Sequence, residues 1–207
     1  LGDDRFAFFL GDICGKGPKA AAATSLARYT LRAAALHGLA PEAVLSTLNS
    51  ALIERYAGGD PRYCTAVFGI LETAGRSVRV LLASGGHPPA LLLRADGRAE
   101  YLPTPGGLLI GAFPQASFTT IRTALHPGDT LLLYTDGLTE ARTGEKSDLY
   151  GYDALQSFAT ELAPADPRTV IDALIRLLVS FGDGLDDDTA LLGLGRPRHS
   201  GTAPTGT

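Results

Sequence analysis

Residues 63–102 read YCTAVFGILETAGRSVRVLLASGGHPPALLLRADGRAEYL, and this stretch decides the fold class. It holds four short apolar runs that are typical of β-strands, at 63–72, 77–84, 89–95 and 98–102. Two of the connections are short enough for hairpins, Thr73-Ala74-Gly75 and Asp96-Gly97. Because no helical pattern separates the runs, consecutive strands are predicted to pair antiparallel.

The rest of the chain surrounds this stretch with helices in pairs. Four more strand-like runs occur at 5–13, 117–125, 129–135 and 188–194, and helical patterns at 18–37, 41–57, 151–163 and 167–181. The order β, αα, six β, αα, β excludes a doubly wound parallel sheet, in which helices alternate with single strands. We therefore predict an α+β fold: a four-layer α/β/β/α sandwich with antiparallel central sheets flanked by two helix pairs.

Composition limits the classes of function. The chain has 207 residues, 45% of them hydrophobic, a formal net charge of −4 and a pI near 5.5. This charge gives no bulk attraction to nucleic acid or to an anionic membrane. The apolar runs end well short of the roughly 18 residues that a membrane span needs, and no signal peptide opens the chain. The sequence thus predicts a cytoplasmic protein without a membrane span in this fragment and without a nucleic-acid partner.

One domain is expected at 1–195, followed by a polar tail or linker at 196–207 that is predicted to be disordered. The chain begins without Met inside a strand-like run, which indicates a piece of a longer protein. Cys14 and Cys64 lie in apolar surroundings and are interpreted as small buried side chains, not as a disulfide or metal pair.

The stretch GDICGKG at 11–17 raises the question of a phosphate-binding loop. A P-loop needs four residues between its first Gly and the Gly-Lys pair, followed by Ser or Thr. Here only Asp12, Ile13 and Cys14 intervene and Gly17 follows, so this class of nucleotide site is excluded.

Acidic residues mark the ends of three predicted strands. Asp12 ends the first strand, Asp136 follows the apolar run DTLLLYT, and the cluster Asp186-Asp187-Asp188 precedes the last strand. Taken singly, each also fits a turn or a solvated loop. If the strand ends share one sheet edge, the carboxylates meet there, and oxygen ligands of this kind suit Mg²⁺ or Mn²⁺.

Four motifs occur together in a fixed order: GDICGKGPKAAA, LLASGGHPPALLL, PGDTLLLYTDGLTEAR with Tyr150-Gly151 following, and DDDTALLGLG. Over about residues 5–194 they closely resemble the PPM-type, or type 2C-like, serine/threonine phosphatases of bacteria. The specific branch is that of stage II sporulation protein E and the sigma-factor regulatory phosphatases. The resemblance implies hydrolysis of phosphoserine or phosphothreonine by metal-activated water, on a phosphorylated protein such as an anti-sigma-factor antagonist.

The resemblance also implies two Mn²⁺ or Mg²⁺ ions and assigns their ligands. Asp12 is similar to the carboxylate that bridges both metals, and the backbone carbonyl of Ile13 to its companion. Asp136 resembles the aspartate of the Thr-Asp-Gly motif. Asp186 resembles the aspartate that completes the first metal site, and Asp187 is its alternative because the acidic residues are adjacent. Through bound metal and water, Asp12, Asp136 and Asp186 would be the catalytic residues.

The chain departs from the family pattern at its start. An earlier strand with a Gly-Gly-Asp-type motif, which helps to hold the second metal, would precede Leu1, so the domain is expected to lack its N-terminal strand and to be weakly active. An upstream sensor domain is expected in the full-length protein, and the polar segment after Gly137 is interpreted as a flap.

Three alternatives stay open. His87 is a candidate general acid by its titration range, although a structural turn histidine is favoured. Lys16 either contacts phosphate or is an ordinary exposed lysine. The whole chain is either the phosphatase or a weakly active or inactive module that keeps the fold to bind a protein partner.

Overall fold

A computed structural model describes residues 1–2, 4–105, 107–143, 148–185 and 187–198. In chain order, the elements are β1 (Arg5–Ile13), α1 (Pro18–Leu36), α2 (Pro41–Arg55), β2 (Cys64–Ala74), β3 (Ser77–Gly85), β4 (Ala90–Leu93), β5 (Ala99–Leu102), β6 (Ile121–Leu125), β7 (Thr130–Tyr134), the 3₁₀ turn η1 (Asp136–Leu138), β8 (Arg142–Thr143), β9 (Asp148–Leu149), α3 (Gly151–Leu162), α4 (Pro167–Ser180), the 3₁₀ turn η2 (Gly182–Gly184) and β10 (Leu191–Gly195). None of the helices in these ranges is both long and apolar enough to cross a membrane.

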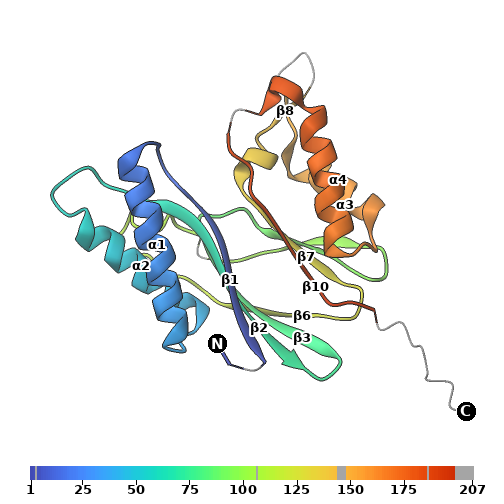
Figure 1. The fold of residues 1–207 in the computed structure, drawn as a ribbon, viewed down its shortest axis with the longest axis horizontal. Coiled ribbons are helices and arrows are strands. Elements are labelled where there is room, and N and C mark those ends of the chain that lie inside the picture. The colour runs from blue at the N-terminus through green and yellow to red at the C-terminus, as the bar shows by residue number, and fades with distance from the viewer. Residues whose placement is uncertain (3, 106, 144–147, 186, 199–207) are drawn as a thin grey trace, which may run out of the picture.

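Two antiparallel four-stranded sheets form the centre of the molecule. The first, sheet A, has the strand order β1-β2-β3-β6, and the second, sheet B, has the order β10-β7-β4-β5. Figure 1 shows α1 and α2 on the outer side of sheet A and α3 and α4 on the outer side of sheet B. The predicted α+β four-layer sandwich, with antiparallel sheets flanked by two helix pairs, is confirmed.

Three separate hydrophobic clusters correspond to the three interfaces between these layers. Leu31, Leu48 and Phe68 belong to the cluster between the first helix pair and sheet A. Val67 and Leu133 belong to the cluster between the two sheets. The third cluster joins sheet B to α3 and α4. Alternate residues of β2 therefore face different clusters, as the period of two in a β-strand requires.

Helix starts follow the local sequence. Proline occupies the first turn of α1, α2 and α4. An N–H group in the first turn has no partner within the helix, so a proline there costs no helical hydrogen bond. Asp166 caps α4, because its carboxylate accepts hydrogen bonds from the amides of Arg168 and Thr169. Buried side chains on α1 recur at the three- and four-residue spacing of one helix face.

Three segments differ from the sequence-based expectation. The strand expected over 117–125 begins only at Ile121, and the one expected over 188–194 begins at Leu191. The segment after Gly137, interpreted as a flap, contains the end of η1 and the strands β8 and β9, which pair with each other. Part of the predicted flap, residues 144–147, lies outside the described residues. So does most of the predicted tail or linker, residues 199–207.

Candidate functional site

Acidic residues from both sheets lie at one end of the sandwich. Asp12 is the penultimate residue of β1 in sheet A. Asp136 follows β7 of sheet B after a single residue, and Asp187 and Asp188 precede β10, which pairs with β7. Asp186, the first choice for the third predicted ligand, lies outside the described residues, whereas its alternative Asp187 lies within them.

Contacts around Thr135 join the two segments of sheet B. The Thr135 hydroxyl donates to the carbonyl of Asp188 at 3.3 Å and accepts from the amide of Ala190 at 2.9 Å. Gly137 packs so closely here that a Cβ atom would lie 2.8 Å from the Asp188 carbonyl oxygen. Residue 137 is therefore restricted to glycine, and Asp136 is held beside the 187–188 segment.

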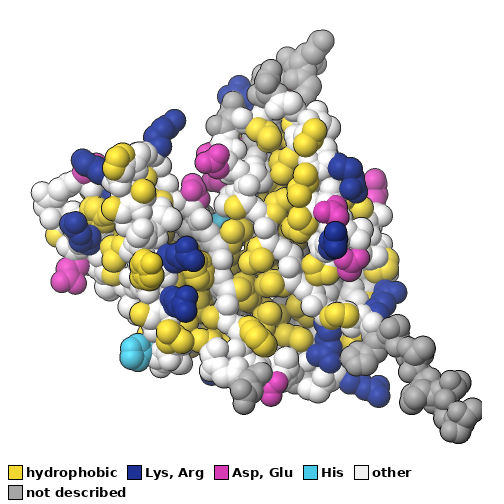
Figure 2. All heavy atoms as spheres, viewed as in Figure 1, with side chains coloured by type: hydrophobic (Ala, Val, Ile, Leu, Met, Phe, Trp, Pro, Cys, Tyr) yellow, Lys and Arg dark blue, Asp and Glu magenta, His cyan; other side chains and the backbone are white. Residues whose placement is uncertain are grey.

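Asp12, Asp187 and Asp188 border a cavity of about 710 Å³, whereas Asp136 is not among the residues that line it. Its lining comprises Asp12, Ile13, Gly15, Lys16, Leu178, Leu185, Asp187, Asp188 and Thr189. Figure 2 shows acidic side chains at the notch between the two helical layers. Desolvation raises the pKa of the Asp12 carboxyl, the Ile13 amide opposes this, and the negative charges of Asp187, Asp136 and Asp188 raise it further. The carboxylates are thus close enough to repel one another.

The donor set consists of oxygen atoms. The backbone carbonyl of Ile13 is a further candidate ligand. Cys64, which lies opposite Ile13 in the ladder, forms its backbone hydrogen bonds with Ile110, at 2.9 and 3.0 Å, and not with β1. Within the described residues, no group of three or more His, Cys, Asp or Glu side chains is arranged to hold a metal ion. The repulsion at Asp12 and the oxygen-only chemistry fit a hard divalent cation, which would neutralise the repelling charges.

Glycines shape the turn that follows Asp12. A Cβ at Gly11 would lie 2.5 Å from the Thr65 carbonyl oxygen, and Gly15 has φ of +96°. Arg62 packs against this turn, since a Cβ at Gly15 would lie 2.9 Å from its Nη1. Arg62 is itself paired with Asp60 at 2.5 Å. Lys16 remains exposed at the cavity rim, where both of its predicted roles are possible in space.

His87 is not part of the lining of this cavity; it lines another one, of about 610 Å³, together with Pro89 and Pro103. The side chain is 7% exposed, and its Nδ1 atom is 3.1 Å from the Thr65 hydroxyl oxygen. Burial lowers the pKa of the imidazole to about 4, with a partly compensating effect of the Tyr134 backbone. These features agree with the favoured structural turn histidine. Thr65 had no signal in the sequence, because its relevance depends on its position opposite Asp12 in the β1–β2 ladder.

Both cysteines are free, as expected. Cys64 is 1% exposed, and burial raises the pKa of its thiol to about 12, which disfavours the reactive thiolate. Cys14 is half-buried next to the turn. Their surroundings assign them no chemistry.

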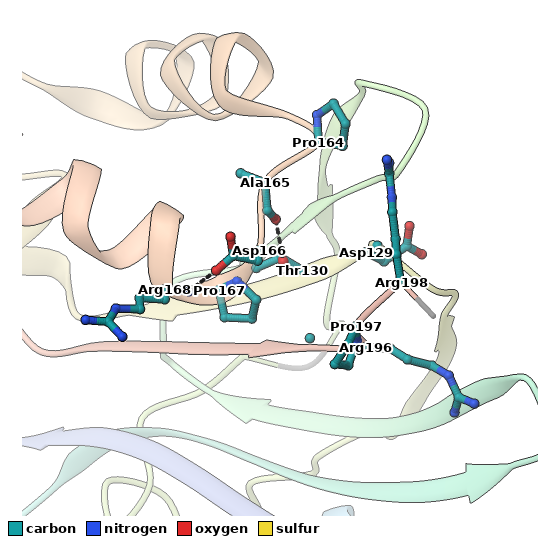
Figure 3. Close-up of a pocket in the computed structure, with 12 residues that line it drawn as sticks. Asp129, Thr130, Pro164, Ala165, Asp166, Pro167, Arg168, Arg196, Pro197 and Arg198 are labelled. Carbon is teal, nitrogen blue, oxygen red and sulfur yellow. Dashed lines mark hydrogen bonds between the residues drawn. The ribbon is translucent and has the colours of Figure 1, made fainter. Parts of the chain in front are cut away.

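A second cavity, of about 600 Å³, lies at the opposite end of β7 and β10 (Figure 3). The carboxylates at this cavity already have partners. Asp129 accepts from Arg94, Ala95 and His126, and Asp166 caps α4. The Thr130 hydroxyl donates to the Ala165 carbonyl at 2.7 Å, which ties β7 to the start of α4. We interpret these groups as structural.

Comparison with known proteins agrees with this arrangement. Phosphoserine phosphatase RsbU of Bacillus subtilis (strain 168) is 25% identical over 172 residues, which cover 81% of this chain and 50% of that protein. The crystal structure of the RsbU and RsbW domains of Rv1364c from Mycobacterium tuberculosis is 30% identical, with a TM-score of 0.77 over 94% of this chain and 52% of that one.

RsbX, solved in complex with magnesium, is 17% identical with a TM-score of 0.66, over 93% of this chain and 82% of that one, and shows likeness of fold alone. The chain spans half or less of the length of the curated relatives it matches. The family model of stage II sporulation protein E (SpoIIE) matches residues 2–197. The chain therefore belongs to the SpoIIE family and forms a phosphatase domain of the PPM, or PP2C-like, type.

Proposed function

We propose that this domain is a metal-dependent protein serine/threonine phosphatase whose centre is built by Asp12, Asp136 and the 186–187 segment. The observation that carries the proposal is the convergence of carboxylates from both sheets beside an open cavity. Such a set has no role in a pure binding module, because uncompensated carboxylates repel one another. The alternative, a weakly active or inactive module that binds a protein partner, is therefore second.

In the proposal, the carboxylates of Asp12, Asp136 and Asp186, or Asp187 in its place, hold two Mn²⁺ or Mg²⁺ ions together with the Ile13 carbonyl. When bound, such ions supply an activated water and neutralise charge on the phosphoryl group. RsbX, a fold relative, was solved with magnesium, which supports this choice. Gly15 and the exposed Lys16 both line the cavity, and we propose that they contact the phosphate there.

The substrate proposed is a phosphorylated protein, because the cavity is open and the relative RsbU is named a phosphoserine phosphatase. We further propose that it is an anti-sigma-factor antagonist, met in the cytoplasm, and that a sensor domain lies upstream in the full-length protein. The greater length of the relatives is consistent with additional domains.

We also propose that residues 1–195 are the phosphatase domain, that 196–207 are a tail or linker, and that an upstream strand completes sheet A. Gly2 forms an antiparallel bridge with Arg5, and the Leu1 amino group donates to the Arg5 carbonyl at 3.1 Å. In a longer chain, residues before Leu1 would therefore continue along the free edge of β1. They would cover Phe6 and Phe9, which are 56% and 38% exposed. A chain extended in this direction should be more active; equal activity would contradict the proposal.

The proposal is tested by hydrolysis of p-nitrophenyl phosphate with Mn²⁺ titrated from none to millimolar and with a chelator as control. Asp136→Asn should lower turnover more than about 100-fold, since even outer-sphere partners of metal ligands contribute 10- to 100-fold. Asp172→Asn is the matched control, because this aspartate is 53% exposed on α4. Turnover that persists in Asp136→Asn would refute the assignment, and absence of both turnover and calorimetric Mn²⁺ binding would favour the binding module.

A further inference from the structure

The β4–β7 ladder ends in a way that leaves one backbone carbonyl without its usual donor. Leu91 pairs with Leu132, so the same register places Pro89 opposite Tyr134. The Thr135 amide donates to Ala190 on the β10 side. Since backbone groups alternate between the two neighbouring strands, those of Tyr134 face the β4 side. Proline has no N–H, and the ladder therefore offers no donor to the Tyr134 carbonyl.

His87 lies two residues before this proline, and its Nδ1 atom and backbone carbonyl both have partners. Its Nδ1 atom is 3.1 Å from the Thr65 hydroxyl, and the buried Ser84 hydroxyl donates to its carbonyl at 3.2 Å. The Nε2 atom is shielded from solvent and has no partner in hydrogen-bonding geometry among the described residues. The backbone of Tyr134 nevertheless acts on the ring, because it opposes the effect of burial on the pKa of His87.

The groups on either side of the imidazole belong to different sheets and adjoin the candidate site. Thr65 lies in β2 of sheet A directly opposite Asp12. Tyr134 ends β7 of sheet B, two residues before Asp136. We propose that His87 is a positioning residue, a bridge between Thr65 and the Tyr134 carbonyl that fixes the separation of the strand ends bearing Asp12 and Asp136. The effect on metal binding rests on the proposed function, whereas the bridge itself does not.

Because burial keeps the ring neutral, the bridge selects one tautomer. A neutral imidazole has one N–H donor and one acceptor nitrogen. The carbonyl of Tyr134 can only accept, so Nε2 carries the proton and Nδ1 accepts from the Thr65 hydroxyl. A leucine at 87 would fill space without either contact, and a glutamine would keep a donor near the position of Nε2.

The bridge is tested first without metal or substrate, by the ¹⁵N chemical shifts of the His87 ring at pH 7. We expect the Nε2–H tautomer. A proton on Nδ1, or on both nitrogens, would overturn the proposal. This measurement decides the bridge even if the chain proves unable to bind Mn²⁺, an outcome that would reject the proposed function instead.

The consequence for the site is tested by Mn²⁺ affinity and by kcat and KM in folded variants. His87→Leu and Thr65→Val should each weaken Mn²⁺ binding and lower kcat about 10- to 100-fold with little change in KM, and His87→Gln should restore part of the loss. The double variant should be little worse than either single one. Val170→Ala, at a 1%-exposed core position on α4, is the control for lost stability. Unchanged Mn²⁺ affinity in folded His87→Leu, or an equal loss in Val170→Ala, would refute the positioning role.

Discussion

Acidification should destabilise this domain through His87, at pH values where most carboxylates are still ionised. Burial holds the pKa of the folded side chain at about 4, against an ordinary value of 6.5. Between these values the unfolded chain binds a proton that the folded chain does not, so stability rises with pH. The contribution of His87 to stability is complete above pH 6.5 and falls as the pH drops toward 4. The difference corresponds to about 3 kcal/mol in the free energy of unfolding, at 1.36 kcal/mol for each pH unit.

Urea unfolding at a series of pH values from 4.5 to 7.5 measures this contribution. His87→Gln has no titrating group at the position and should lose about 2.5 kcal/mol less than the wild type between pH 7.5 and 4.5. The difference between the two proteins removes the contribution of the carboxylates, which both share. His37→Gln, at the exposed C-terminal cap of α1, is the control for exchanging a histidine for a glutamine. Parallel pH profiles for wild type and His87→Gln would show that the imidazole is not held neutral by burial.

Two substitutions, at Asp129 and Gly137, test the groups at the two ends of β7. Asp129→Asn breaks the ion pair of a 3%-exposed carboxylate with Arg94 and should lower the free energy of unfolding in urea by about 3 kcal/mol. Glu100→Gln removes the more exposed partner of Arg94 and should lower it by less than about 1 kcal/mol. Equal losses would refute a larger contribution from the buried carboxylate. Gly137→Ala places a Cβ 2.8 Å from the Asp188 carbonyl oxygen, so it should displace the 187–188 segment, weaken Mn²⁺ binding and cost about 1–3 kcal/mol; unaltered Mn²⁺ affinity by calorimetry would contradict this reading.

The layers were predictable because each depends on local signals. Hairpin turns such as Asp96-Gly97 fix the pairing of neighbouring strands, and α1, α2 and α4 begin at prolines, which are disfavoured inside a helix. The order of strands within the sheets was not predictable in the same way. β6 joins β3 although β4 and β5 lie between them in sequence, and such pairing depends on which apolar faces are buried together.

The strand starts that were placed too early have side-chain causes. The Thr120 side chain exchanges hydrogen bonds with the backbone and the carboxylate of Glu42 on α2, and Phe118 packs into the cluster under the first helix pair. These contacts direct residues before Ile121 toward the helices and away from the ladder. At the last strand, the Asp188 carbonyl and the Ala190 amide bond to the Thr135 side chain, whereas the Ala190 carbonyl still accepts from the Thr135 amide.

The candidate site was predictable in its carboxylates but not in its supporting contacts. An aspartate at the end of an apolar run is visible in sequence, and the charges of Asp136 and Asp187 act on the Asp12 carboxyl; that these residues hold metal stays a prediction. The contact between His87 and Thr65 joins residues 22 positions apart and depends on strand register. The clue that was present is Pro89, because a proline at the start of a strand removes a donor that another group must replace.

The division of the carboxylates between two sheets has a physical consequence. Asp12 belongs to a strand of sheet A, whereas Asp136 and Asp187 adjoin strands of sheet B, so their separation depends on how the sheets pack. The apolar contacts between the sheets, such as those of Val67 and Leu133, are non-directional and resist separation more than sliding. A directional contact at the edge, like that proposed for His87, limits sliding where the carboxylates meet. A small shift of one helix pair relative to the other would therefore alter the candidate site without unfolding either layer.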